Sequence, residues 1–208
     1  SAGAAVESLP ELSKRGGRSR PLKPCPPAAA EREIETLAKL GARLIAKAEP
    51  DYPEGLAAIE DAPPVITVRG RMELLAAPKI ALVGARNASA NGRRIADDMA
   101  AGLAAAGYVV VSGMARGIDT AAHAGALRNA SGAGGTIAVI AGGIDVLYPP
   151  ENAALFERLG HEGLIVAEAS PGTEPVARHF PRRNRIISGI FRAVAVGESA
   201  IRSGSLNT

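Results

Sequence analysis

The stretch Lys79-Ile-Ala-Leu-Val-Gly84 is a short apolar run that ends at a glycine, and the same pattern returns at Tyr108-Val-Val-Val-Ser-Gly113. A continuous apolar run of this length is typical of a strand that is buried on both faces of a parallel sheet. A stretch with helical periodicity, from Ile95 to Ala106, lies between the two runs. Strand, glycine loop and helix in this order predict a β-α-β unit with parallel strands.

The same alternation continues on both sides of this unit. Towards the C-terminus it predicts strands at 135–141, 163–167 and 193–196, and helices at 120–128, 153–159 and from residue 183. Towards the N-terminus it predicts a helix from residue 31 and short strands at 43–46 and 65–68. The expected fold is α/β, with a mostly parallel, doubly wound sheet and helices on both faces. Ligands of such sheets bind beyond the carboxyl ends of the strands, so we expect the site in the loops that begin at Gly84, Gly113, Gly142 and Glu168.

Residues 1–30 differ from the rest of the chain. Residues 13–30 contain five basic side chains and no acidic one, and the proline-rich run at 21–27 is incompatible with a helix interior. We interpret residues 1–30 as a peripheral segment that ends in an exposed basic linker. The alternative is a basic strip that contacts a polyanion. Residues 31–208 then form the main domain, whose core begins near residue 78.

The composition excludes several classes of protein. The chain has 208 residues, a formal net charge of +3 and 47% hydrophobic residues, which is ordinary for a globular protein. Its single cysteine excludes a disulfide framework and a cysteine-cluster metal site, and its three histidines are too scattered for a zinc site. No apolar stretch is long enough to span a membrane and nothing reads as a signal peptide, so we expect a cytoplasmic protein. Aromatic residues are scarce, so any nucleic acid would be bound mainly through its phosphates.

The first glycine loop, Val83-Gly-Ala-Arg-Asn87, has features of a phosphate site. Gly84 would let the backbone approach a ligand, and the helix that we expect after Gly92 would offer free amide donors at its N-terminus. Arg86 adds a forked donor that suits phosphate. The loop contains neither a G-x-G-x-x-G nor a Walker A motif. The plainer interpretation is a tight strand-to-helix turn with an arginine on its surface.

The second glycine loop places Arg116 between Gly113 and Gly117. His123 follows Asp119 by four residues, and an Asp–His pair at this spacing suggests an acid–base pair. We favour a helix cap and a packed histidine, because no serine or cysteine nucleophile is partnered with the pair.

Two later stretches also follow predicted strands. Tyr148 is expected near the rim of the loop that begins at Gly142. The run Arg178-His-Phe-Pro-Arg-Arg-Asn-Arg185 holds four arginines and no acid, and its Phe180 offers a stacking face. The usual interpretation of such a run is a solvated surface, but its place after a strand favours a functional role. Together with Arg86 and Arg116, the run points to the binding of a polyphosphate rather than its hydrolysis.

Five short motifs occur in one order between about residues 50 and 206. They are Gly84-Ala-Arg86; Ser112–Asp119 with Ala122-His123; Gly142–Asp145 with Tyr148-Pro149 and Asn152; Phe180–Gly189; and Ser203-Gly-Ser-Leu206. Each motif alone is weak. The ordered set closely resembles the DNA-processing protein A (DprA/Smf) family.

The resemblance implies an extended Rossmann-like fold that uses no nucleotide cofactor, in a bacterial cytoplasmic protein of natural transformation that is not an enzyme. Members of the family bind and protect incoming single-stranded DNA, load the RecA recombinase onto it, and typically form homodimers. The family's DNA site is a basic pocket at the carboxyl edge of the sheet. Its motifs correspond here to Arg86, to Arg183, Asn184 and Arg185, and to the aromatic Phe180.

The expected DNA-binding set joins these residues to the glycine loops and the rest of the arginine run. It consists of Gly84, Arg86, Gly113, Arg116, Gly117, Arg178, Phe180, Arg183, Asn184 and Arg185. The amides of the three glycines are expected to take phosphate oxygens. Arginines 86, 116, 183 and 185 are expected to neutralise phosphates, while the phenylalanine stacks on a base. No metal site is expected.

The chain departs from the family pattern at both ends. Only a stump of the family's N-terminal helical domain is expected, at 6–14, and the winged-helix-like C-terminal domain has no counterpart. The family pattern continues past Leu206, so we expect a fragment or a chain that lacks some stretches.

Two alternatives to a DNA-binding protein remain open. Related Rossmann-like enzymes cleave nucleoside monophosphates and carry a Pro-Gly-Gly-x-Gly-Thr signature. Gly134-Gly-Thr136 superficially matches part of it, but it precedes a strand instead of following one. A mononucleotide-binding module is the other alternative, and it would prefer a free nucleotide to an oligonucleotide.

Overall fold

The structure is a computed structural model that describes residues 2–17, 19–20, 22–128 and 134–198. The chain forms two compact units, residues 1–36 and 37–208. The first unit contains helix α1 (Ala2–Arg15) and most of α2 (Pro27–Lys39). Within the described residues, no helix has the length and apolarity that crossing a membrane requires.

The second unit contains all seven strands of one sheet. The strands are β1 (Ala42–Ala46), β2 (Val65–Gly70), β3 (Lys79–Gly84), β4 (Val109–Ser112), β5 (Gly135–Val139), β6 (Leu164–Ala167) and β7 (Ala193–Gly197). The α-helices between them are α3 (Glu54–Ala57), α4 (Ala90–Ala105), α5 (Ile118–Arg128), α6 (Ala153–Glu162) and α7 (His179–Ile190). Among the described residues the unit also has two short 3-10 helices, η1 (Met72–Leu75) and η2 (Pro150–Asn152).

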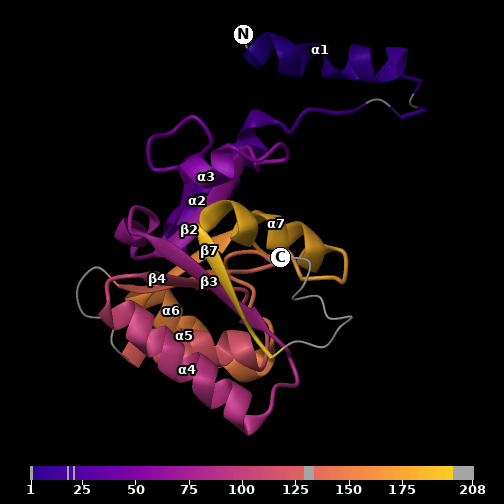
Figure 1. Cartoon of the computed structure of the whole chain (residues 1–208). Coiled ribbons are helices and arrows are strands. Elements are labelled where there is room, and N and C mark those ends of the chain that lie inside the picture. Colours follow the sequence, from indigo (N-terminus) through magenta and orange to yellow (C-terminus); the bar gives the residue numbers. More distant parts are fainter. Residues whose placement is uncertain (1, 18, 21, 129–133, 199–208) are drawn as a thin grey trace. The chain divides into compact units, whose positions relative to one another are not determined.

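The sheet has the strand order β1-β2-β6-β5-β4-β3-β7. The five strands from β6 to β7 are parallel, whereas β1 and β2 join antiparallel at one edge. The predicted mostly parallel, doubly wound sheet is therefore confirmed (Figure 1). The strand order reverses between β3 and β7, and crevices near such a reversal are where open α/β sheets bind ligands.

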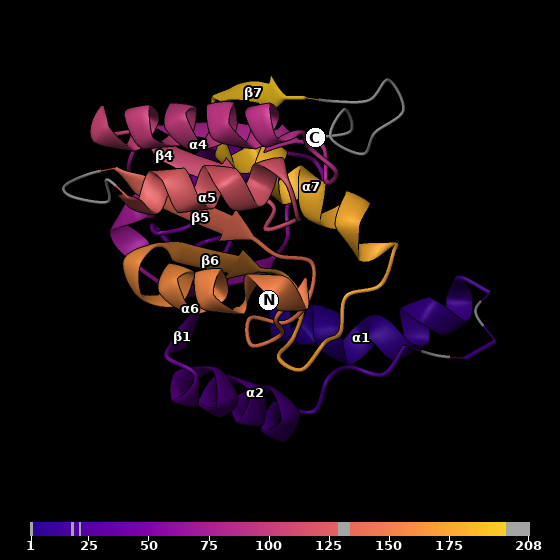
Figure 2. The same ribbon diagram turned by 90° about the horizontal axis from the view of Figure 1, so that it is seen from below.

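Both faces of the sheet are covered, as the continuous apolar runs predict. In β4, Val109 and Val111 pack in a cluster with Ile186 and Ile187 of α7, while Val110 packs against the alanines of α4 and α5. Helices α4, α5 and α6 lie on one face and α7 lies on the other (Figures 1 and 2). Helix α7, which carries the arginine run, therefore lies across the sheet from α5, which follows the second glycine loop.

Helix α4 differs most from its prediction. It begins at Ala90, where the Ser89 hydroxyl accepts the Gly92 amide at 2.9 Å, and not near Ile95. Its buried residues are all alanines, while the larger Ile95 and Met99 are exposed. The cause is close packing on α5, because a Cβ atom at Gly125 of α5 would overlap the α4 backbone at Asp97. Only small side chains fit between two helices at this separation.

Candidate nucleic-acid interface

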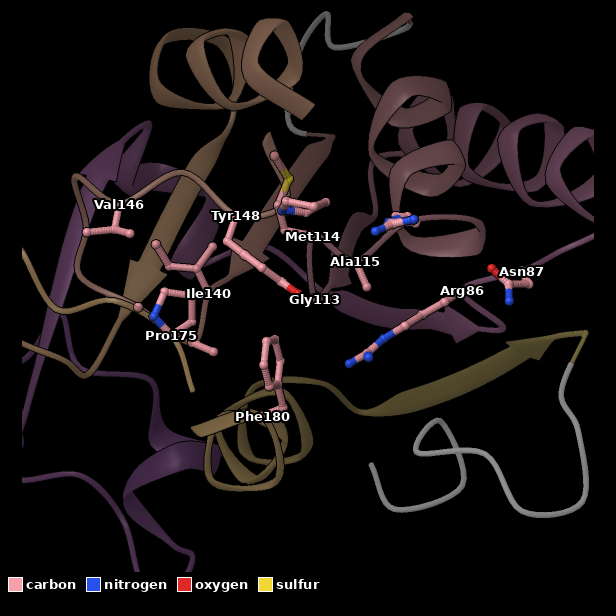
Figure 3. A pocket seen from close by; sticks show the side chains of 14 residues that line it. Arg86, Asn87, Gly113, Met114, Ala115, Ile140, Val146, Tyr148, Pro175 and Phe180 are labelled. Atoms are coloured by element: carbon pink, nitrogen blue, oxygen red, sulfur yellow. The ribbon is translucent and has the colours of Figure 1, made fainter. Parts of the chain in front are cut away.

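A pocket of about 160 Å³ opens at the carboxyl ends of β3, β4 and β5 (Figure 3). Five segments line it: the turn after β3, the loop Gly113–Gly117 (the Gly113 loop), the loop after β5, the loop after β6, and the start of α7. The lining residues are Arg86, Asn87, Gly113, Met114, Ala115, Arg116, Ile140, Ala141, Gly142, Val146, Tyr148, Pro149, Pro175 and Phe180. This is the edge of the sheet at which the glycine loops place the site.

Arg86 and two aromatic rings dominate the mouth of the pocket. The Arg86 guanidinium carbon lies 5.2 Å from the centre of the Phe180 ring, and the Tyr148 ring lies 5.6 Å from the same ring, tilted by 54°. Among the described residues, no acidic side chain forms an ion pair with Arg86, which is exposed. The mouth therefore offers an available cation beside two ring faces (Figure 3).

The second arginine of the pocket has an acidic partner. Arg116 Nε lies 2.6 Å from Glu151 Oε1, and the side chains are 63% and 48% exposed. An ion pair this exposed is worth about 0–1 kcal/mol. A phosphate can therefore displace Glu151 from Arg116 at little cost.

Apolar side chains line the part of the pocket away from Arg86 (Figure 3). Met114, Ile140, Val146 and Pro175 contribute side chains to its lining. An apolar surface beside a basic side chain suits the ring of a nucleobase next to its phosphate.

Three buried polar side chains hold the Gly113 loop. Asp119 Oδ2 accepts the amides of Gly113 and Ala115, both at 3.2 Å. Asn152 Nδ2 donates to the Met114 carbonyl at 3.1 Å, and Arg183 Nη1 donates to the Gly113 carbonyl. Met114 has a φ of +64°, which is costly for a residue with a side chain and needs such support.

Burial shifts the pKa values of the two charged groups beside the loop. Burial raises the pKa of Asp119, while the nearby charge of Arg183 and the two backbone donors oppose that rise. Burial also lowers the pKa of Arg183 to about 10, against the attraction of Asp119. Arg183 therefore stays protonated at neutral pH, because its pKa remains well above 7.

His123 is a packed histidine, as favoured above, and not half of an acid–base pair. Its side chain is fully buried, and its Nδ1 lies 2.7 Å from the Thr136 hydroxyl. That hydroxyl donates its only proton to the Val110 carbonyl, so His123 Nδ1 must carry a proton and donate it. Asp119 binds the loop backbone rather than the imidazole. His123 Nε2 has no hydrogen-bond partner within the part of the chain that the structure describes.

Replacing His123 with leucine should flatten the response of stability to acid. Burial lowers the pKa of His123 from 6.5 to about 3. Below pH 6.5 this histidine is therefore protonated in the unfolded chain but stays neutral in the folded chain. This histidine alone makes the parent lose up to about 1.4 kcal/mol of unfolding free energy per pH unit in that range. Urea unfolding of the parent and His123→Leu at pH 7, 6, 5 and 4 measures the difference. Parallel curves for the two proteins would contradict this assignment.

Four of the ten predicted site residues line the pocket: Arg86, Gly113, Arg116 and Phe180. The glycines have other roles than the expected phosphate binding. The Gly113 amide is already donated to Asp119, so it is not free to bind a phosphate. Gly84 pairs with Gly197 of β7, and a Cβ atom there would overlap the Gly197 carbonyl. Gly117 has a φ of +77° and packs against the turn that carries Arg86.

The arginine run divides into residues with different surroundings. Arg183 is only 7% exposed and donates to two backbone carbonyls, so direct phosphate neutralisation by this side chain does not fit its position. Asn184 accepts from Arg183 Nε at 3.1 Å. Arg185 forms ion pairs with Glu168 at 2.6 Å and Asp61 at 3.4 Å.

Arg178 precedes α7, is exposed and does not line the pocket. A direct phosphate contact by Arg178 stays a prediction. The Ser203–Leu206 motif lies outside the described residues.

Several residues that line the pocket or support its loops were not predicted. Tyr148 was expected at a loop rim but not in the DNA-binding set, and its position after Gly142-Gly143 was the available signal. Asn152 appeared in a motif without a role, although it is 6% exposed and supports Met114. No sequence signal distinguishes Asn87 or Pro175 as lining residues.

Family models cover most of the chain. Residues 43–208 match the model of DNA recombination-mediator protein A, and residues 1–36 match a DprA-like N-terminal HHH domain. The DNA processing protein DprA of Streptococcus pneumoniae is 46% identical over 157 residues, which are 76% of this chain and 54% of that protein. DprA of Bacillus subtilis is 40% identical over 158 residues, 76% of this chain and 52% of that protein. This chain therefore spans about half the length of these relatives.

Two solved structures share the fold. The X-ray structure of DprA from S. pneumoniae has a TM-score of 0.79 at 40% identity. The match covers 88% of this chain and 62% of the S. pneumoniae chain. DNA processing protein A from Helicobacter pylori has a TM-score of 0.72 at 27% identity. The match covers 80% of this chain and 73% of the H. pylori chain, and that protein is described with a unique single-stranded DNA binding mode. The chain belongs to the DNA recombination-mediator protein A family.

Proposed function

We propose that this chain binds single-stranded DNA at the pocket, without preference for base sequence and without catalysing a reaction on it. The observation that carries the proposal is the exposed Arg86 guanidinium beside the Phe180 and Tyr148 rings, at the mouth of a pocket with apolar walls. A cation next to ring faces matches the repeating unit of a single strand, which is a phosphate followed by an unpaired base.

The contacts follow from the geometry. Arg86 binds one phosphate through its forked donors, and Arg116 binds a neighbouring one after Glu151 has moved away. Phe180 stacks on a base whose ring enters the apolar part of the pocket. All four bases have a ring face and all nucleotides share the phosphate, so these contacts do not read sequence. A base in a duplex is already stacked and paired, and a single strand is therefore preferred.

The wider role in the proposal is that of the family. The chain protects incoming single-stranded DNA in the cytoplasm, loads RecA onto it during transformation or recombination, and acts as a homodimer. The family name and the single-stranded DNA binding described for the H. pylori relative support this role. The buried state of His123 and the loop contacts of Asp119 favour a binding function over acid–base catalysis.

Competition with mononucleotides separates this proposal from the two alternatives. A labelled 20-nucleotide single strand is bound to the chain and displaced either by the same unlabelled strand or by deoxynucleoside monophosphates at equal nucleotide concentration. We expect the oligonucleotide to displace the label at a concentration at least tenfold lower, since several phosphates and bases bind together. Displacement by the monophosphates at the lower concentration would support a mononucleotide module. Release of a free base from a monophosphate during the incubation would support the enzyme.

A further inference from the structure

Within the arginine run, Arg183 has surroundings that phosphate binding does not explain. Its side chain projects from the first part of α7 towards the sheet and is 7% exposed. Nη1 donates to the Val139 carbonyl at the end of β5, at 2.5 Å, and to the Gly113 carbonyl after β4. One buried guanidinium thus joins α7 to the ends of two neighbouring strands.

The guanidinium of Arg183 occupies the space that a side chain at Gly113 would fill. A Cβ atom at Gly113 would lie 2.6 Å from the Arg183 Cζ atom, so any larger residue would push the guanidinium away. The absence of a side chain at this position therefore serves the protein's own arginine and not an approaching ligand. The glycine and the arginine, 70 residues apart in sequence, form one unit.

Asp119 completes the unit from the opposite side of the sheet. It accepts the Gly113 amide, so both polar backbone groups of Gly113 are bonded to buried side chains of opposite charge, one from α5 and one from α7. Each charge reduces the cost of burying the other. Removal of either side chain would leave the other buried and less compensated, and the Gly113 loop would lose one of its supports.

We propose that Arg183 is a positioning residue for DNA binding, which fixes the Gly113 loop against α7 and does not itself contact the phosphates. The inference rests on the proposed function of the pocket. Phe180 precedes Arg183 by three residues on the same helix, so the two lie about one turn apart. The same bond network therefore sets the position of the Phe180 ring relative to Met114, Ala115 and Arg116 of the loop.

The salt dependence of binding distinguishes positioning from direct contact. The variants are Arg183→Gln, Arg183→Lys and Arg86→Ala, with Arg158→Ala as a control that removes the same charge. Arg158 lies on α6, pairs with Glu162 and reaches the Leu127 carbonyl at the far end of α5 from the pocket. Affinity for a 20-nucleotide single strand is measured at several salt concentrations, and thermal unfolding establishes that each variant is folded.

We expect Arg183→Gln to weaken binding at least tenfold while the slope of log affinity against log salt stays at the parental value. Lysine retains a charge and can donate to one of the two carbonyls, so Arg183→Lys should recover part of the loss. Arg86→Ala should reduce the magnitude of the slope by about 0.7, the value for one phosphate contact on a single strand. A slope reduced by the same amount in Arg183→Gln, or parental affinity in that variant, would overturn the positioning role.

Hydrogen exchange tests the positioning role without DNA. The amides of Gly113 and Ala115 should exchange faster in Arg183→Lys than in the parent, because the loop has lost part of its support, whereas Arg158→Ala should leave them unchanged. Unchanged loop amides in Arg183→Lys would overturn the inference even if DNA binding fell. If the parent does not bind single strands, the proposed function fails, while these exchange rates still decide whether Arg183 holds the loop. If Arg183→Gln does not fold, Gly113→Ala replaces it in the binding experiment, because the added methyl group would displace the Arg183 guanidinium without removing its charge.

Discussion

Arg86→Ala is expected to weaken the binding of a single strand by about 10- to 100-fold. Hydrogen bonds to a charged group contribute about 1.5–3 kcal/mol, and about 1.4 kcal/mol corresponds to a tenfold change in affinity. Arg86 is the exposed guanidinium of the pocket that has no acidic partner among the described residues, and it lies 5.2 Å from the Phe180 ring centre. Its removal therefore eliminates a phosphate contact and one side of the stacking site. Fluorescence anisotropy with a labelled 20-nucleotide strand measures the loss.

The loss should be the same for strands of different base composition, because the contact proposed for Arg86 is with the phosphate. Arg158→Ala removes an equal charge from a surface ion pair outside the pocket and should change the affinity less than twofold. An Arg86→Ala protein that binds as tightly as the parent would show that this pocket is not the DNA site.

Gly117→Ala is expected to reduce binding by more than tenfold although it changes no charge. Gly117 has a φ of +77°, and a Cβ atom there would overlap the carbonyl oxygens of Ala85 and Arg86. Ile118, the next residue, donates its amide to the Ala85 carbonyl at 3.2 Å. The methyl group would therefore push the turn that carries Arg86 away from the start of α5. We also expect a loss of about 1–3 kcal/mol of unfolding free energy, which urea unfolding measures.

Gly102→Ala is the matched control for this substitution. Gly102 lies in α4 with an ordinary φ, and apart from the adjacent backbone of its own helix no described atom would lie within 4 Å of a Cβ atom there. Alanine at an exposed helical position should raise the unfolding free energy by up to about 1 kcal/mol and leave DNA binding unchanged. Equal DNA affinities of Gly117→Ala and Gly102→Ala would contradict the role given to Gly117.

The strands of the core could be predicted because one requirement, burial of both faces of the strand, determines their sequence pattern. Strands buried on both faces need apolar side chains on both faces, and Tyr108–Ser112 contains such a run before Gly113. Helix α4 was harder, because the side chains that pack inward are alanines such as Ala100 and Ala104, while Ile95 and Met99 face outward. Hydrophobic periodicity gives most weight to the largest residues, and here those residues lie on the exposed side.

The burial of Arg183 was missed for a similar reason. In the sequence it is one of four arginines within eight residues, and nothing in composition distinguishes it from Arg182 or Arg185. Its helical spacing does, since Arg183 lies on the same buried stripe as Ile186, Ile187 and Ile190. The prediction began this helix at Arg183 instead of His179, and the stripe was not extended to the arginine. The glycines were difficult for a related reason. A backbone that approaches a ligand closely and one that packs closely on another backbone segment both need glycine, so the sequence does not distinguish the two.

The most direct test of the DNA-binding pocket is the affinity of the chain for a labelled 20-nucleotide single strand at two salt concentrations, with a matched duplex as competitor. Phosphate contacts by Arg86 and Arg116 predict a log–log salt slope of roughly −1.4 for single strands. The account predicts this slope, together with little displacement by the duplex. Binding that is insensitive to salt, or equal affinity for single strand and duplex, would contradict it.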